Sequence, residues 1–261
     1  MKYFLLFAML TIIISCDPKS KPESSSPDDA QWISLFNGEN LDGWTMKIAG
    51  FEIGENYGNT FRVVDGILSV RYDEYDSFNN TFGALHYNKV FSDFRLKVEY
   101  RFVGETAAGA PAWGFRDSGI QYHGQDPKSM AIDQPFPVCL EYNLHGGNGT
   151  DDRPVGQICA NGIDIEMNGE KIEAYCTPPT VKHTFHGDQW VTLEIESKGG
   201  LFKHFVNGEE IIKFENPQFD PDHELGKLFF NEADNTVKQG YISIQSNSHP
   251  IDFRKIEIME L

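Results

Sequence analysis

The chain has 261 residues and a formal net charge of −17, from 39 acidic and 22 basic residues. A surface this acidic repels phosphate backbones and anionic lipid, which argues against nucleic acid as a partner and favours a neutral ligand. Aromatic residues make up 13% of the chain, enough to fill a core and also to offer ring faces to a sugar.

The amino terminus is typical of a bacterial secretory signal. One basic residue, Lys2, precedes an apolar run over residues 4–14 that is too short to span a bilayer as a mature helix. The segment Ile13-Ile14-Ser15-Cys16 resembles a lipobox, which predicts lipidation of Cys16. The alternative is cleavage elsewhere, with Cys16 left free. We therefore expect a lipoprotein of the bacterial cell envelope, periplasmic or anchored in the outer membrane, that contacts the membrane only through its lipid.

Residues 16–30 follow the signal, residues 1–15, as a lipidated cysteine and a flexible tether. This stretch is rich in Pro and Ser and has no apolar run that could enter a core. Residues 31–261 contain no second low-complexity stretch and no repeat, so they are expected to form one domain.

Strand signals begin early in this domain. An Asp65-Gly66 turn predicts a β-hairpin over residues 61–70. Residues 82–86 form a further predicted strand. In residues 94–102, apolar and charged side chains alternate, which predicts a strand with a buried and a solvated face.

Two later segments, residues 116–123 and 138–145, are the centre of the prediction. At a period of two, each has an apolar face and a polar face, and the polar faces collect Gln, His, Glu and Asn. We interpret them as adjoining strands that form the floor of a polar cleft; the alternative is two ordinary half-solvated strands. Loops over residues 124–137 and 145–154 are expected to form its walls.

The last third of the chain continues the same pattern. Strands are predicted over residues 189–196, 240–246 and 251–258, with an Asn207-Gly208 hairpin over residues 201–214. Short strands separated by turn signals, with hardly any helical periodicity, predict an all-β fold, an antiparallel two-sheet sandwich.

Three cysteines follow Cys16, so at least one stays unpaired if Cys16 is the lipid anchor. A second Asn-Gly pair, at residues 168–169, predicts a hairpin that sets Cys176 opposite Asn161 and diagonal to Cys159. A small bulge would bring the two sulfur atoms into bonding range. We expect a Cys159–Cys176 disulfide, with Cys139 left as a small residue beside Glu141.

Several segments of the chain form a recognisable set: Leu35–Trp44, Asp117–His123, Glu141–Asn143, His204–Gly208 and Gly240–Ser246 followed by Pro250–Arg254. Taken together, they resemble the 3-keto-disaccharide hydrolase family, formerly a domain of unknown function, and the resemblance covers nearly all of the chain from Trp32 onward. It implies a concanavalin A-like jelly roll that acts on sugars whose C3 hydroxyl a separate oxidoreductase has already oxidised.

The family also implies a chemistry. A C3 ketone acidifies the C2 proton, so that a base can remove it, the enolate can expel the C1 substituent, and water can then add. Such a site needs a base, an acid near the leaving oxygen and a group that stabilises the enolate. We expect Glu141 to be the base or a metal ligand and His123 to be the acid or the enolate stabiliser. No cofactor is certain, and a divalent cation held by these two residues stays open.

The remaining candidates are substrate-binding residues. Gln121, Asn143 and Gln245 are expected to bind sugar hydroxyls. Arg116 and Asp117, at the mouth of the first floor strand, either clamp the substrate or pair with each other. The expected ligand is a neutral oligosaccharide or glycoside.

Two other functions compete with the enzyme. A non-catalytic sugar-binding module fits the same fold, because a fold does not decide a function. An interaction domain tethered to a larger surface complex fits the lipoprotein tail. The enzyme is preferred because the sequence offers a polar constellation without an obvious row of exposed tryptophans.

Overall fold

The computed structural model describes residues 31–261. The predicted signal, the lipidation site Cys16 and the tether lie outside these residues and stay predictions. Within residues 31–261, no helix has the length and apolar character needed to cross a membrane.

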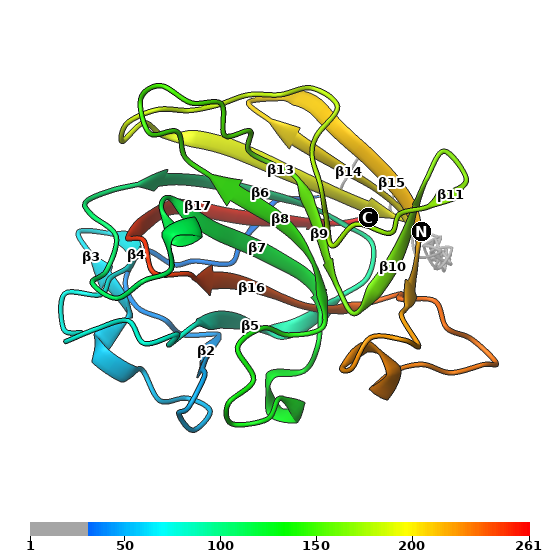
Figure 1. Ribbon diagram of the computed structural model, residues 1–261, viewed down its shortest axis with the longest axis horizontal. Coiled ribbons are helices and arrows are strands. Elements are labelled where there is room, and N and C mark those ends of the chain that lie inside the picture. Colours follow the sequence, from blue (N-terminus) through cyan, green and yellow to red (C-terminus); the bar gives the residue numbers. More distant parts are fainter. Residues whose placement is uncertain (1–30) are drawn as a thin grey trace, which may run out of the picture.

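Two antiparallel sheets packed face to face make up the described part of the chain (Figure 1), which confirms the predicted sandwich. The ten-stranded sheet has the order β11-β10-β15-β14-β13-β6-β17-β4-β3, with β1 paired to β17. Its strands are β1 Ile33–Ser34, β3 Phe61–Val64, β4 Ile67–Val70, β6 Phe94–Phe102, β10 Ile163–Met167, β11 Glu170–Lys171, β13 Val191–Lys198, β14 Leu201–Val206, β15 Glu209–Phe219 and β17 Ile251–Glu260.

The seven-stranded sheet has the order β12-β9-β8-β7-β16-β5-β2. Its strands are β2 Trp44–Ile48, β5 Gly83–Phe91, β7 Asp117–Gly124, β8 Cys139–His145, β9 Ile158–Asn161, β12 Cys176–Thr177 and β16 Gly240–Ser246. Short 3-10 turns are the helical elements of the described chain: η2 Tyr57–Asn59, η3 Ala112–Gly114, η4 Pro127–Ser129 and η5 Gly226–Leu228.

The core lies between the sheets because each strand alternates as the sequence predicts. In β6, the apolar residues Phe94 to Phe102 are buried at every second position, and the charged residues between them are half-buried on the outer face. In β7 and β8, the apolar members Ile120, Tyr122, Leu140 and Tyr142 belong to the same core. The polar residues Gln121, Glu141 and Asn143 therefore face away from the other sheet.

The three predicted Asx-Gly turns are all present. Asp65-Gly66 joins β3 to β4, Asn168-Gly169 joins β10 to β11, and Asn207-Gly208 joins β14 to β15. Both residues of each pair have positive φ, between 48° and 86°, as a two-residue hairpin turn requires. These turns fix the register of the neighbouring strands.

The Cys159–Cys176 disulfide is confirmed, but the predicted register is wrong. Cys176 lies directly opposite Cys159 in the β12–β9 pair, whereas the residue opposite Asn161 is Cys139, a buried free thiol. The Asn-Gly hairpin lies in the ten-stranded sheet and pairs only β10 with β11. After it the chain crosses to the seven-stranded sheet, so turn counting could not give the pairing.

The loop over residues 125–137 contacts β2 and the segments beside it. Its Ile132 carbonyl accepts hydrogen bonds from Lys47 Nζ (2.8 Å) and from the Gly50 amide (2.8 Å). At its end, Phe136 packs on Phe82 with ring centroids 5.1 Å apart. Phe136 also lines a cavity together with polar residues of β7, β8 and β16.

Candidate functional site

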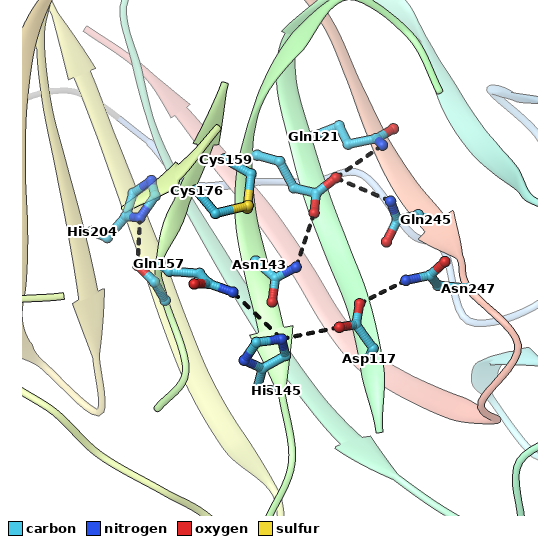
Figure 2. Close-up of a disulfide and its surroundings, with 12 residues drawn as sticks. Asp117, Gln121, Asn143, His145, Gln157, Cys159, Cys176, His204, Gln245 and Asn247 are labelled. Carbon is cyan, nitrogen blue, oxygen red and sulfur yellow. Dashed lines mark hydrogen bonds and ion pairs between the residues drawn. A yellow bond between two sulfur atoms is a disulfide. The ribbon is translucent and has the colours of Figure 1, made fainter. Parts of the chain in front are cut away.

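Three cross-strand rows of residues lie on the outer face of the seven-stranded sheet. Glu141 of β8 pairs with Gln121 of β7 in the first row, Asn143 with Gly119 in the second, and His145 with Asp117 in the third. Strand β16 continues these rows through Ser243, which pairs with Gln121, and then through Gln245 and Asn247 along the same alternation. The side chains labelled in Figure 2 from the second and third rows converge on one space.

Glu141 is the centre of this arrangement. Its carboxylate is buried, with 7% of the residue exposed, and among residues 31–261 no Lys or Arg side chain forms an ion pair with it. Instead, Oε2 accepts hydrogen bonds from Gln121 Nε2 and Gln245 Nε2, both at 3.1 Å, and Oε1 accepts one from Asn143 Nδ2 at 3.3 Å. Three amides from three strands therefore hold one carboxylate in a fixed orientation.

Gly119 provides the space for this carboxylate. A Cβ atom at Gly119 would lie 2.5 Å from Cδ of Glu141 and 2.7 Å from its Oε1. The Glu141 side chain therefore lies over the second row and points toward the third. Only glycine at this position permits the approach.

The surroundings shift the acidity of Glu141. Burial raises the pKa of Glu141 to about 7; the nearby Asp117 carboxylate adds to the increase, and the hydrogen bonds from Gln121 and Asn143 oppose it. The neutral and ionised forms are therefore both populated near neutral pH. A carboxylate with this pKa is suited to accept and return a proton.

The third row is a second hydrogen-bonded group. His145 Nε2 lies 3.0 Å from Asp117 Oδ2, and Asn247 Nδ2 donates to Asp117 Oδ1 at 2.6 Å (Figure 2). Gln157 Nε2 lies 3.4 Å from the same ring nitrogen of His145. Because Asp117 and Gln157 both lie at Nε2 of His145, Nδ1 remains as the ring nitrogen for another partner.

The amides of this face are oriented by the carboxylates. Asn143, Gln245 and Asn247 each direct their NH₂ group to Glu141 or Asp117, and their oxygen atoms are buried without a partner among the described residues. A buried acceptor without a donor is unfavourable by about 1–3 kcal/mol.

A cavity of about 320 Å³ opens above the second and third rows. Its polar residues come from β7, β8, β16 and the chain around them, and its aromatic residues and the disulfide come from the flanking segments. The lining residues are Trp113, Asp117, Phe136, Glu141, Asn143, His145, Gln157, Cys159, Tyr175, Cys176, Gln245 and Asn247.

The structure brings together four of the predicted site residues, Asp117, Glu141, Asn143 and Gln245, in this cavity. Gln121 is adjacent but does not line the cavity. Its amide nitrogen donates to Glu141, and its oxygen accepts from Ser243 Oγ at 2.8 Å. Gln121 therefore orients the carboxylate, rather than meeting a ligand.

The prediction that His123 shares a face with Gln121 is wrong. The β7–β16 pair shifts register between Tyr241 and Ser243, and His123 there takes a φ of 48°. This bulge turns the imidazole into the sandwich, where its Nε2 lies 2.9 Å from Ser197 Oγ and its ring stacks on Phe94. Burial lowers the pKa of His123 to about 4, so the ring is neutral.

The same bulge separates His123 and Glu141, the two residues that were expected to hold a divalent cation. His123 points into the sandwich and Glu141 into the cavity, so the two do not form one ligand set. Among residues 31–261, no group of three or more His, Cys, Asp or Glu side chains is arranged to hold a metal ion.

Arg116 and Asp117 do not pair with each other. Arg116 donates to the Gly187 carbonyl at 2.6 Å and to Asp188 Oδ1 at 2.9 Å, outside the cavity. Asp117 instead pairs with His145 and Asn247. The alternation of β7 separates the two neighbours, and Arg116 itself has a φ of 42°.

The sequence analysis assigned no role to several lining residues. His145 lies on the predicted polar face, and Asn247 continues the alternation two residues beyond Gln245, so both could have been found from periodicity. Trp113 and Tyr175 come from irregular segments, where the sequence has no periodic signal.

Residues 31–259 match the model of a family described as a 3-keto-alpha-glucoside-1,2-lyase-like domain. No curated protein matches the chain.

Solved structures share the fold at low sequence identity. A putative glycosyl hydrolase from Parabacteroides distasonis is 19% identical with a TM-score of 0.51, over 88% of this chain and 94% of that one. LamA of Z. galactanivorans, in complex with laminaritriose and laminaritetraose, is 10% identical with a TM-score of 0.54, over 88% and 98%. A Bacillus subtilis protein of unknown function with a galectin-like fold is 10% identical with a TM-score of 0.51, over 84% and 90%.

Proposed function

The chain belongs to the 3-keto-alpha-glucoside-1,2-lyase-like family, and from this premise we propose that its cavity cleaves 3-keto-glycosides. The observation that carries the proposal is Glu141, a buried carboxylate with a pKa raised to about 7, held by three amides on the floor of a cavity. This combination supports a general base, since a base is most effective when its pKa lies near the working pH.

In the first step, Glu141 removes the proton from C2 of the sugar. The C2–H bond breaks, its electron pair forms the C2–C3 double bond, and the negative charge moves to the C3 oxygen. Asn143 and Gln245 support this step, because each amide nitrogen has a second N–H besides the one directed at Glu141. These N–H groups are candidates to stabilise the enolate oxygen.

In the second step, the enolate expels the substituent at C1. The C1–O bond breaks, C1 and C2 become doubly bonded, and the C3 ketone is restored. We assign the proton for the leaving oxygen to doubly protonated His145: Asp117 holds the Nε2–H at 3.0 Å, and the proton on Nδ1 is transferred, which leaves a neutral ring. His145 replaces His123 in this role because His145 lines the cavity.

In the third step, water adds to the double bond: its oxygen bonds to C1, its proton returns to His145, and Glu141 gives its proton to C2, which yields a 3-keto sugar with a free C1 hydroxyl. A reaction that stops before the addition releases the enone, the product of a lyase. Either outcome requires a substrate that a sugar 3-oxidoreductase has already oxidised.

The substrate is best described as a neutral sugar. Asn143, Gln245 and Asn247 line the cavity, and uncharged amides of this kind suit the hydroxyl groups of a sugar. Two buried carboxylates, Glu141 and Asp117, disfavour an anionic substrate in the same cavity.

A non-catalytic sugar-binding domain is the second candidate. The amides that line the cavity and the exposed ring of Trp113 would serve binding alone. Binding alone gives no reason for a buried carboxylate that has no Lys or Arg partner among residues 31–261, because such a group costs stability. The enzyme is therefore the better account.

The test is release of the leaving group from a 3-keto-glucoside and from its unoxidised parent. We expect release from the keto sugar alone, and a loss of about a thousandfold in kcat/KM for Glu141→Gln, since general base catalysis contributes roughly 10²–10⁴. Glu232→Gln, at an exposed loop position, is the matched control and should keep full activity. Binding of the keto sugar without release by the unaltered protein would identify a binding domain instead.

A further inference from the structure

Ser243 supports the candidate site from outside the cavity. It lies in β16, is 1% exposed, and does not line the cavity that Glu141 lines. Its Oγ donates to Gln121 Oε1 at 2.8 Å, and Gln121 Nε2 donates in turn to Glu141 Oε2 at 3.1 Å. A continuous chain of hydrogen bonds therefore runs from a buried hydroxyl through one amide to the carboxylate.

Gln121 differs in this respect from the other two amides that hold Glu141. The oxygen atoms of Asn143 and Gln245 are buried and have no hydrogen-bond donor among residues 31–261, whereas the oxygen of Gln121 has Ser243. A buried acceptor that loses its donor becomes unfavourable. Gln121 is therefore the amide whose orientation is fixed at both of its ends.

The groups in this chain of hydrogen bonds permit one direction while Glu141 is ionised. A carboxylate only accepts, so the NH₂ group of Gln121 faces Glu141 and its oxygen faces Ser243. The Ser243 hydroxyl then donates its single proton to that oxygen. Without this donor, the amide can rotate by half a turn and direct its oxygen at the carboxylate, which disfavours the ionised form.

The register shift in β16 sets Ser243 opposite Gln121. Tyr241 of β16 pairs with Gly124. Two residues later, Ser243 pairs with Gln121, which is one residue out of step. If the register of Tyr241 continued, Ile244 would lie opposite Gln121 instead. The bulge therefore places a hydroxyl, rather than an apolar side chain, beside the amide.

Titratable groups surround this chain of hydrogen bonds on several elements. Opposite Ser243 lies His86 of β5, and burial together with the nearby Lys47 lowers the pKa of His86 to about 3, so its ring is neutral. Replacing Ser243 removes none of these groups, so a change in the titration of Glu141 reports on the hydroxyl. The titratable groups around Glu141 are Asp117 of β7, Cys139 and His145 of β8, and Tyr175 before β12.

We propose that Ser243 is a positioning residue for the base: it acts through Gln121, keeps the NH₂ group of this amide on Glu141, and so favours the ionised carboxylate. This proposal rests on the proposed function, in which the ionised carboxylate removes the C2 proton. Ser243 does not touch the substrate in this role. Its effect is therefore expected on turnover and on the pH dependence of turnover, rather than on substrate binding.

The test is the pH profile of kcat on a 3-keto-glucoside for Ser243→Ala. Burial raises the pKa of Glu141 and the hydrogen bond from Gln121 opposes this increase, so weakening that bond should raise the pKa further, by up to about one unit. The acidic limb of the profile then moves to higher pH. The loss of kcat should be roughly tenfold at pH 6 and at most about threefold at pH 9, with little change in KM.

Two variants of similar shape separate the hydroxyl from the packing. Ser243→Thr keeps the hydroxyl and should return the profile to that of the unaltered protein. Ser243→Val adds the same bulk without a hydroxyl and should behave as Ser243→Ala. Ser69→Ala is the control, because it removes a buried hydroxyl that donates to Asp252 Oδ1 at 2.9 Å in the ten-stranded sheet, and it should leave the profile unchanged.

Identical profiles for Ser243→Thr and Ser243→Val, or an unshifted profile for Ser243→Ala, would overturn the role of Ser243. Failure of the unaltered protein to cleave any keto sugar would instead contradict the proposed function. The contact is then tested without activity, by carbon NMR titration of the Glu141 carboxyl group, with its signal assigned from Glu141→Gln. An equal pKa of Glu141 in Ser243→Ala and in the unaltered protein would overturn the role of Ser243 there as well.

Discussion

The outer faces of the two sheets treat their charges in opposite ways. On the ten-stranded sheet, Glu194 forms ion pairs with Arg95 at 2.9 Å and with Lys97 at 3.6 Å. On the seven-stranded sheet, Glu141 meets only amides, and the partners of Asp117 are His145 and an amide. Both faces arise from the same two-residue alternation. Periodicity alone therefore does not distinguish a solvated face with ion pairs from a face that holds a candidate site.

The tryptophans of the two faces repeat this difference. Trp190 lies between two guanidinium groups, with Arg101 at 4.6 Å and Arg254 at 4.4 Å from its ring. Trp113 has Phe82 beneath it and is otherwise open, at 53% exposure. On the ten-stranded sheet, Glu194 and Trp190 therefore have cationic side chains as neighbours. In the cavity, Glu141 and Trp113 have amides and a phenyl ring as neighbours instead.

The largest expected effect that separates the faces is the pH dependence of stability. The folded pKa of Glu141, about 7, lies above its ordinary value of 4.5, so the fold favours the protonated form and loses stability as pH rises from about 4.5 to about 7. Glu141→Gln removes this loss. The free energy of unfolding of Glu141→Gln minus that of the unaltered protein should be about 3 kcal/mol larger at pH 8 than at pH 4, measured by urea unfolding.

The matched variant on the outer face of the ten-stranded sheet, Glu194→Gln, should change the free energy of unfolding in the opposite direction. Glu194→Gln leaves Arg95 and Lys97 without their carboxylate, so we expect the free energy of unfolding at pH 8 to fall by about 1 kcal/mol. Parallel pH profiles of Glu141→Gln and the unaltered protein would contradict the raised pKa.

A smaller effect tests how Glu141 is accommodated. Gly119→Ala introduces a Cβ atom 2.5 Å from Cδ of Glu141, and such overpacking should cost about 2 kcal/mol. In a Glu141→Ala background the space is free, so the same change should cost much less. A double-mutant cycle by urea unfolding measures this coupling, and an additive result would show that the glycine serves another purpose.

The smallest expected effect concerns the third row. Asp117→Asn removes the carboxylate that orients His145, so kcat on the keto sugar should fall about tenfold with little change in KM. It also removes a carboxylate that raises the pKa of Glu141, so the acidic limb of the pH–rate profile should move to lower pH. On the other face, Asp252→Asn removes the partner of Arg71 and Arg101, and should lower stability without moving that profile. An unchanged kcat for Asp117→Asn would remove His145 from the reaction.

Much of the fold could be predicted because its signals are local. The alternation of residues 94–102 and the Asx-Gly turns depend on neighbours along the chain, and both are confirmed. The polar faces of β7 and β8 were likewise predictable, including the placement of Glu141 beside Gln121.

The rest of the site depends on contacts that a sequence does not encode locally. His123 is turned into the core by a bulge against β16, a strand more than a hundred residues away in sequence. Arg116 finds Asp188 because two loops meet, and Trp113 is placed by Phe82 and Ser248. Each of these required the partner strand or loop to be known first.

The disulfide has a consequence for how the protein is made. Cys159 lies opposite Glu141 across β8 and β9, and its bond to Cys176 secures β12, an edge strand of two residues that follows Tyr175. A strand this short has little hydrogen bonding of its own, so its attachment depends on the covalent link. The cavity wall is therefore finished by oxidation after synthesis, and protein produced in a reducing cytoplasm should acquire its sandwich before it acquires a complete cavity.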